Sequence, residues 1–167
     1  MFNLEMAKDK TNIIAFGRFA QENCERKGAK KPETFDFLGF THYCSKNKKG
    51  YFRVKRKTSS KKMRSKLKKC KQWLKANRTM GTAFIMDRMK RSLTGYYNYY
   101  CITDNLPTVK KYLFLVNKLL FKWLNRRSQK KSFTWEKFNL LLQRFPLPEP
   151  RNKVNIYELR DHVGYIK

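Results

Sequence analysis

The chain has 167 residues, and its 40 Lys and Arg residues against 12 Asp and Glu residues give a formal net charge of +28. Hydrophobic residues make up 41% of the chain and aromatic residues 15%, which excludes a disordered basic tail and indicates a packed core. The length suits one substantial domain or two small ones. Charge of one sign at this density attracts polyanions, because neutralised phosphates release condensed counterions. The composition therefore predicts a folded protein that binds nucleic acid.

The cysteines predict no metal site. Cys24, Cys44, Cys70 and Cys101 lie far apart in the chain, without the spacing of a zinc finger, and we expect buried thiols in a reducing compartment. The N-terminal residues contain no uninterrupted apolar core, and the apolar stretch 112–124 is too short to span a bilayer. We expect a cytoplasmic protein associated with nucleic acid, with no cofactor and no membrane partner.

The first part of the chain is expected to contain strands and turns. Residues 13–16 form a short apolar run, and residues 21–33, with Gly and Pro, are typical of a loop. A second strand is expected over residues 35–43. Turn-forming residues at 47–50 precede an alternation of apolar and basic residues at 51–55. This pattern predicts a β-hairpin with one apolar face and one positively charged face.

The hydrophobic period then changes to that of an α-helix, and two helices are expected before residue 101. Ser59 or Ser60 can cap the first helix, and Thr82 can cap the second. Apolar residues recur at helical spacing in both helices, at Met63, Leu67, Cys70 and Leu74 in the first and at Ile85, Met89, Leu93, Tyr96 and Tyr100 in the second.

Two further helices are expected in the second half of the chain. Asp104 or Asn105 can cap the third, with Pro107 in its first turn, and Thr134 opens a fourth that Pro146 ends. Their apolar stripes are Val109, Tyr112, Leu113, Val116, Leu120 and Trp123 in the third and Trp135, Phe138, Leu141, Leu142 and Phe145 in the fourth. Both tryptophans are therefore expected in the core.

This layout predicts an α+β protein in which a small antiparallel β-element precedes a bundle of about four helices. We place the domain boundary after residue 58, giving domains at 1–58 and 59–167. A lone hairpin is marginally stable in water. The first domain is therefore expected to be a piece of a larger sheet.

One stretch of the chain, from Phe37 to Met86, contains sixteen Lys or Arg residues and no Asp or Glu. Aromatic and aliphatic residues are interleaved with the charges, as expected for a folded surface rather than a tail. The stretch divides at Ser59 into the hairpin and the first helix of the bundle. A second acid-free basic stretch covers residues 110–131.

Several blocks of this sequence carry a resemblance. Residues 10–17 (KTNIIAFG) and 35–40 (FDFLGF) resemble the last two sequence blocks of a reverse-transcriptase palm. Residues 93–100 (LTGYYNYY), the long third helix and the fourth helix leading into residues 147–151 (LPEPR) resemble the maturase-specific domain of group II intron-encoded proteins, also called domain X or the thumb. The resemblance covers nearly the whole chain. It implies the C-terminal part of a group II intron reverse transcriptase/maturase: the end of the palm followed by domain X.

The resemblance also implies roles for individual residues. Phe37, Leu38 and Gly39 resemble the primer-grip element, and Lys10 resembles the basic residue of the preceding block; Gly39 could equally mark a simple bulge. Polymerases of this family hold two metal ions with clustered carboxylates, including a Tyr-Ala-Asp-Asp block. No two acidic residues are adjacent in this chain. No catalytic residue or metal ligand is therefore assigned, and polymerase activity is not expected from this chain alone.

The residues expected to bind RNA are the basic side chains of the hairpin and helices, together with a few aromatic ones. They are Lys10, Arg53, Lys55, Lys57, Lys61, Lys62, Arg64, Lys66, Lys68, Lys69, Trp73, Arg78, Tyr97, Tyr99, Arg126, Arg127, Lys130 and Lys131. Either Tyr97 or Tyr99 is expected to reach RNA, whereas Phe35 and Phe37 are expected in the sheet core. The four basic residues after the third helix could instead compensate its dipole.

These observations lead to one functional hypothesis and two open alternatives. The chain is expected to be an RNA-binding maturase portion that clamps structured group II intron RNA and assists splicing, while the RNA catalyses its own transesterification. It could instead be the C-terminal piece of a split or truncated RNA-directed DNA polymerase, active only with a separate chain that supplies fingers and palm. It could also be a decayed remnant of a mobile element.

Overall fold

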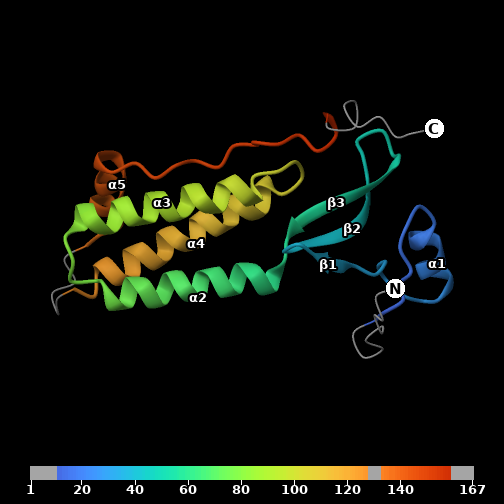
Figure 1. Cartoon of the computed structure of the whole chain (residues 1–167), viewed down its shortest axis with the longest axis horizontal. Helices are drawn as coiled ribbons and strands as arrows, with labels where there is room; N and C mark the ends of the chain where they lie inside the picture. Colours follow the sequence, from blue (N-terminus) through green and yellow to red (C-terminus); the bar gives the residue numbers. More distant parts are fainter. Residues whose placement is uncertain (1–10, 128–132, 159–167) are drawn as a thin grey trace, which may run out of the picture. The chain divides into compact units, whose positions relative to one another are not determined.

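A computed structural model of the chain describes residues 11–127 and 133–158. In this part three strands form an antiparallel sheet, with one helix before it and four helices after it in the chain, which confirms the predicted α+β class (Figure 1). The helices are α1 (Ala20–Arg26), α2 (Ser60–Ala76), α3 (Thr82–Tyr100), α4 (Leu106–Leu124) and α5 (Trp135–Arg144). The strands are β1 (Phe35–Phe37), β2 (Phe40–Lys46) and β3 (Phe52–Thr58).

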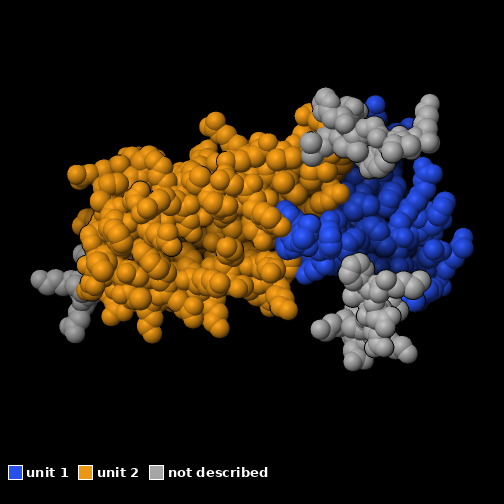
Figure 2. Space-filling model, in the orientation of Figure 1, with its two compact units in different colours: residues 1–55 blue, residues 56–167 orange. Residues whose placement is uncertain are grey.

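The chain divides into two compact units, residues 1–55 and residues 56–167 (Figure 2). The first unit contains α1, β1, β2 and the start of β3, and the second contains the end of β3 and the remaining helices. The boundary that we predicted after residue 58 corresponds to the end of β3. The assignment of the first domain to a palm stays a prediction.

The sheet has the strand order β1-β2-β3, and its first hairpin corrects the strand predicted over residues 35–43. Phe37 pairs with Phe40 across a two-residue turn at Leu38 and Gly39, whose φ angles are 47° and 81°. Two positive φ angles define the turn type whose twist matches that of the flanking strands. Leu38 is strained in this region, since its Cβ approaches the following carbonyl oxygen. The chain therefore reverses at Leu38 and Gly39, within the segment that was predicted as one strand.

The second hairpin forms where turn residues predict it. Asn47 Oδ1 accepts the backbone N–H groups of Lys49 and Tyr51, each at 2.9 Å, and Gly50 adopts a φ of 84°. An Asn side chain that binds its own downstream backbone in this way stabilises a turn. The hairpin between β2 and β3 is therefore confirmed.

Helix α1 replaces the loop predicted over residues 21–33. It ends in a Schellman motif, because Ala29 N donates to Cys24 O at 2.9 Å and Gly28 N donates to Glu25 O at 3.0 Å. Gly28 supplies the left-handed residue that this motif needs, with a φ of 70°. The glycine taken as a loop residue is thus a helix stop. The strand predicted at 13–16 is also wrong, since residues 11–16 form no regular element.

The four helices of the second unit confirm the predicted helices, but the N-cap of α3 is Gly81 and not the predicted Thr82, which is the first residue of the helix. Helix α4 packs against both α2 and α3. The predicted stripes of α3 and α4 are buried except for Leu113, which is half-buried, and Tyr96 stacks on Tyr112 with ring centroids 3.9 Å apart. Burial raises the pKa of Tyr96 to about 12 and that of Cys70 to about 11, because both groups ionise poorly without water. The bundle therefore has a genuine core.

The segment after α5 runs back along α3 in an extended conformation (Figure 1). Lys153 N donates to Cys101 O at 2.8 Å, and Thr103 N donates to Val154 O at 3.1 Å. Pro150 is buried on the way. These bonds fix the segment to the junction between α3 and α4. No helix in the described ranges has the length and apolarity needed to cross a membrane.

Candidate nucleic-acid interface

Eight basic side chains of α2 are exposed to solvent. We call them the α2 basic face: Lys61, Lys62, Arg64, Lys66, Lys68, Lys69, Lys71 and Lys75. The helix has no Asp or Glu of its own. Among the described residues, no carboxylate forms an ion pair with any of the eight. Their charge is therefore available to a polyanion.

The sequence of α2 places this charge on both sides of its apolar stripe. Three rows run in parallel along the helix, each with offsets of four, three and four residues, which an α-helix aligns on one face. The rows are Met63, Leu67, Cys70 and Leu74; Lys62, Lys66, Lys69 and Trp73; and Arg64, Lys68, Lys71 and Lys75. The middle row of Met63 to Leu74 contains the buried residues of α2, so both basic rows border the core.

This arrangement destabilises the isolated helix. Like charges three or four residues apart repel, at about 0.2–0.5 kcal/mol for each pair. Such pairs in α2 are Lys61–Arg64, Lys62–Lys66, Arg64–Lys68, Lys66–Lys69, Lys68–Lys71 and Lys71–Lys75. Their sum is on the order of 1–3 kcal/mol, a substantial part of a small domain's stability. A bound polyanion would remove this repulsion.

The N-terminus of α2 adds to the same effect. The Ser59 side chain forms no capping hydrogen bond, and the first turn has no acidic residue. Lys61 and Lys62 instead bring positive charge to the positive end of the helix dipole. The predicted serine cap is thus present by position only. The missing cap and the positive charges in the first turn both lower the stability of α2.

The basic residues of β3 are less exposed than those of α2. Arg53 and Lys55 are half-buried, and Lys57 is exposed. All three lie on one face of the strand because side chains alternate along it. The hairpin therefore carries the charged face that its alternation predicts.

The three residues that resemble a primer grip lie at the tip of the first hairpin. Phe37 is 59% exposed and Leu38 67% exposed, and both flank the turn glycine Gly39. Phe37 was expected in the sheet core, and this expectation is wrong because the chain reverses immediately after it. Phe35 remains half-buried and stacks on His42, with centroids 4.8 Å apart. The tip therefore presents two apolar side chains to solvent.

The four tyrosines of α3 differ in their exposure to solvent. Tyr97 is buried together with Tyr96 and Tyr100, whereas Tyr99 is half exposed. The apolar face of α3 is wide enough to include consecutive positions because the helix packs on α4 and is also followed by the C-terminal segment. Tyr97 is thus corrected to a core residue. Tyr99 is the tyrosine of this pair that a ligand can reach.

Two other predicted contacts are partly engaged within the fold. Trp73 is half-buried and packs near Phe84, with ring centroids 6.3 Å apart. Arg78 follows α2 and donates from Nη1 to Lys75 O at 3.3 Å. Both border the α2 basic face. Lys10, Lys130 and Lys131 lie outside the described residues.

The two arginines after α4 have different environments. Arg127 Nη1 donates to Thr82 Oγ1 at 2.8 Å and Nη2 donates to Met80 O at 2.9 Å. Partial burial lowers the pKa of its guanidinium. Arg126 is exposed and lies over the Trp123 ring, 5.5 Å from its centroid. The structure therefore uses Arg127 to connect α4 to the start of α3 and leaves Arg126 accessible.

Among the exposed aromatic residues that the sequence did not predict, two lie on α4 and α5. Trp135 was assigned to the core on its helical spacing, but it is 51% exposed because it is the first residue of α5 and covers the end of the bundle. Phe114 is 55% exposed on α4. Phe114 lies off the apolar stripe and among lysines, a pattern from which its exposure could have been predicted.

The acidic residues do not form a metal centre. Among the described residues, no three His, Cys, Asp or Glu side chains are grouped closely enough to hold an ion. Asp87 forms an ion pair with Arg91 at 2.6 Å, and Asp104 accepts a hydrogen bond from the Tyr157 hydroxyl.

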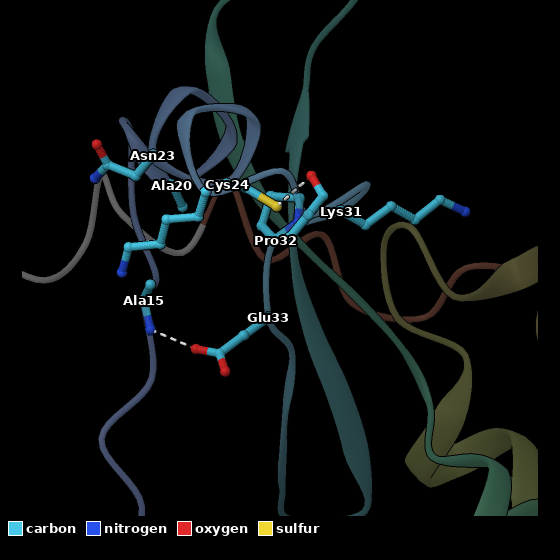
Figure 3. Close-up of a pocket in the computed structure, with 9 residues that line it drawn as sticks. Ala15, Ala20, Asn23, Cys24, Lys31, Pro32 and Glu33 are labelled. Atoms are coloured by element: carbon cyan, nitrogen blue, oxygen red, sulfur yellow. Dashed lines mark hydrogen bonds between the residues drawn. The ribbon is translucent and has the colours of Figure 1, made fainter.

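A pocket in the first unit also offers little chemistry (Figure 3). Its wall includes Ala15, Ala20 and Pro32, and two of its polar side chains, Glu33 and Cys24, form hydrogen bonds with other residues of the wall. Glu33 Oε2 accepts the N–H of Ala15 at 2.6 Å, and Cys24 Sγ donates to the carbonyl oxygen of Ala29 at 3.1 Å. The pocket is a packing feature of the segment around α1.

The second unit is, by its fold, a small helical bundle with one strongly basic helix face. Residues 60–140 match the family model described as the group II intron, maturase-specific domain. The match begins with α2 and ends within α5, so it includes the α2 basic face. Residues 60–140 are thus similar to the maturase-specific domain of group II intron proteins, which confirms the resemblance predicted for this part of the chain; the resemblance of residues 10–17 and 35–40 to a palm stays a prediction. No curated protein and no solved structure matches the chain.

Proposed function

We propose that this chain is the RNA-binding portion of a group II intron maturase, and that it clamps structured intron RNA to assist splicing. The observation that carries this proposal is the α2 basic face, which lies inside the matched domain. Eight exposed charges without acidic partners lower the stability of α2, and a phosphate backbone would compensate them. A surface that served only solubility would not need charge of one sign.

The proposed mechanism is binding rather than bond-making. Lysine ammonium groups contact phosphates without reading sequence, so the face would position the RNA. The deep groove of an A-form duplex is poorly accessible, and specificity would come from RNA shape and from unpaired loops. Holding the intron in its folded state would leave the transesterification to the RNA.

The tip of the hairpin between β1 and β2 offers a second site of contact with RNA. Phe37 and Leu38 are exposed at its tip, and Gly39 allows a close approach of the backbone. In the family that the sequence resembles, this element positions a primer end. We assign the tip the corresponding role of touching the end of a bound strand.

The test is a splicing assay with a panel of group II intron transcripts, at a magnesium concentration too low for self-splicing. The chain is expected to restore splicing of its cognate transcript. A variant with Lys61, Lys62, Lys66 and Lys69 changed to Ala should lose this activity, whereas the matched variant with Lys30, Lys31, Lys48 and Lys49 changed to Ala should retain most of it. Equal loss in both variants would contradict a role for α2.

One observation favours a second candidate function, that of a polymerase piece completed by another chain. Within the described residues the sheet has three strands, and β1 is a three-residue edge strand next to the exposed tip. Sheet edges accept further strands. The chain would then complete a separate fingers and palm chain. Adding it to a group II reverse transcriptase truncated before its thumb should restore primer extension; no gain over the truncated enzyme would exclude this function.

A further inference from the structure

Trp135 forms an aromatic platform at the end of the bundle. Its indole stacks on Phe121 with ring centroids 3.9 Å apart and an interplanar angle of 5°, and Phe138 meets it edge-on at 5.8 Å. These contacts cover one face and one edge of the ring. Trp135 is nevertheless 51% exposed, and we infer that this exposure includes the indole face opposite Phe121, which neither contact covers. The ring is therefore held rigidly, with one face open.

The solvent-facing side of α4 continues from this platform. Its exposed side chains are Pro107, Lys110, Lys111, Phe114, Lys118 and Lys122. Phe114 is 55% exposed, and the Lys118 ammonium lies 4.6 Å from its ring centroid. No acidic residue occurs between residues 105 and 135. Lysines thus alternate with aromatic rings along one side of the helix, separate from the α2 basic face.

We propose that this side of α4 and Trp135 form a track for single-stranded RNA, in which a base stacks on Trp135 and the lysines contact the strand's phosphates. The track rests on the proposed function, because it adds a single-strand site to an RNA-binding domain. Base stacking on aromatic rings combined with a basic groove is the general way in which proteins hold single strands. A duplex offers no free base face and would not use the platform.

The dimensions of α4 suit this ligand. Phe114 and Phe121 are seven residues apart, which places them about 10 Å apart along the helix axis. Three stacked nucleotides span a similar distance at about 3.4 Å each. A strand with a base on Trp135, which covers Phe121, would therefore reach Phe114 a few nucleotides further on.

Charge favours RNA over a protein partner at this surface. An apolar protein would have to bury Lys118 and Lys122 beside the two rings, at a large desolvation cost. A phosphate backbone neutralises the same lysines as it binds. Glu136 is the acidic residue next to Trp135, and its place in the first turn of α5 suits the helix dipole.

The experiment compares three probes: short oligo(U), an abasic RNA strand of the same length, and an RNA duplex. Trp135→Leu keeps an apolar cover on Phe121 but removes the aromatic face. It should weaken oligo(U) binding about 5- to 100-fold and leave the affinities for the abasic strand and the duplex unchanged. Trp135→Phe should retain most of the oligo(U) affinity. Tryptophan fluorescence of the unmodified chain should respond to oligo(U), and this response should be smaller in Trp135→Phe, in which Trp73 and Trp123 remain.

Two outcomes would overturn the track. Unchanged oligo(U) affinity in Trp135→Leu, with duplex binding intact, would show that the ring does not touch bases while the proposed function stands. An equal loss for all three probes would show that Trp135 acts through the fold. If the unmodified chain binds none of the probes, the proposed function fails and the track fails with it.

Discussion

Asn105 Oδ1 accepts the backbone N–H of Thr58 at 2.7 Å, although 47 residues separate the two in the chain. Asn105 Nδ2 donates to Thr58 Oγ1 and to Tyr100 O, each at 2.8 Å. Both residues are buried. Asn105 occupies the N-cap position of α4, yet its side chain caps nothing and binds the end of β3 instead. One amide therefore joins the start of α2, the end of α3 and the start of α4.

Replacing Asn105 should destabilise the second unit strongly. Asn105→Ala would leave the buried N–H of Thr58 without its partner, at about 1–3 kcal/mol for an unsatisfied group. It would also remove one of the hydrogen bonds that the carbonyl of Tyr100 accepts, while the bond from Ile102 N remains. We expect a loss of roughly 3 kcal/mol in the free energy of unfolding, measured by urea denaturation followed by circular dichroism. The control is Asn139→Ala, the same change at an exposed position of α5. Equal stabilities for the two variants would contradict the role of the network.

The neighbouring arginines Arg126 and Arg127 should separate binding from stability. Arg127→Ala removes the bonds to Thr82 and Met80 and should lower the unfolding free energy by about 1–3 kcal/mol. Arg126→Ala removes one exposed charge, so it should weaken RNA binding and change stability by less than about 1 kcal/mol. Thermal melts and RNA titrations on both variants provide the comparison. The prediction fails if Arg126→Ala is the more destabilising change.

Substitutions of Tyr97 can separate the contribution of its buried ring to stability from that of its hydroxyl group. Its side chain is 3% exposed, and its Oη has no hydrogen-bond partner among the described residues. A buried hydroxyl without a partner is unfavourable. Tyr97→Phe should therefore leave the melting temperature unchanged or raise it, whereas Tyr97→Ala should cost about 3–5 kcal/mol. A large loss on Tyr97→Phe would mean that the hydroxyl has a partner.

The buried thiol of Cys70 should make stability depend on alkaline pH. Burial raises its pKa from 9.0 to about 11, so the folded state keeps a proton that the unfolded state has lost over this range. The full contribution is present below pH 9 and is lost as the pH rises toward 11. Its slope is about −1.4 kcal/mol per pH unit. The unfolding free energy of Cys70→Ala should fall less steeply than that of the unmodified chain between these pH values; parallel curves would contradict the assignment.

The sequence predicted the helical bundle well because each helix of the second unit has a long apolar stripe and a recognisable start. Thr134 is the clearest case, since its side chain accepts the N–H of Lys137 as a helix cap should. Asn105 shows the limit of the same reasoning. Its position as N-cap is predictable, but the buried partner of its amide lies 47 residues away and leaves no local pattern.

The first unit was predicted less well for a different reason. Short elements there depend on single residues whose role local sequence does not reveal, such as Gly28 as a helix stop and Leu38 in a left-handed turn. The candidate site residues also differ in how well local sequence predicts their exposure. The exposed lysines of α2 follow directly from helical spacing, whereas the burial of Tyr97 and the exposure of Trp135 depend on where the bundle ends.

The most direct test of a phosphate clamp on α2 is the salt dependence of RNA binding. We expect the logarithm of the affinity of the unmodified chain to fall linearly with the logarithm of salt concentration, with a slope of several units. Changing Lys61, Lys62, Lys66 and Lys69 to Ala should reduce this slope by about 3 units and slightly stabilise α2, because repelling charges are removed. A flat salt response, or a slope that the four substitutions leave unchanged, would contradict the central claim.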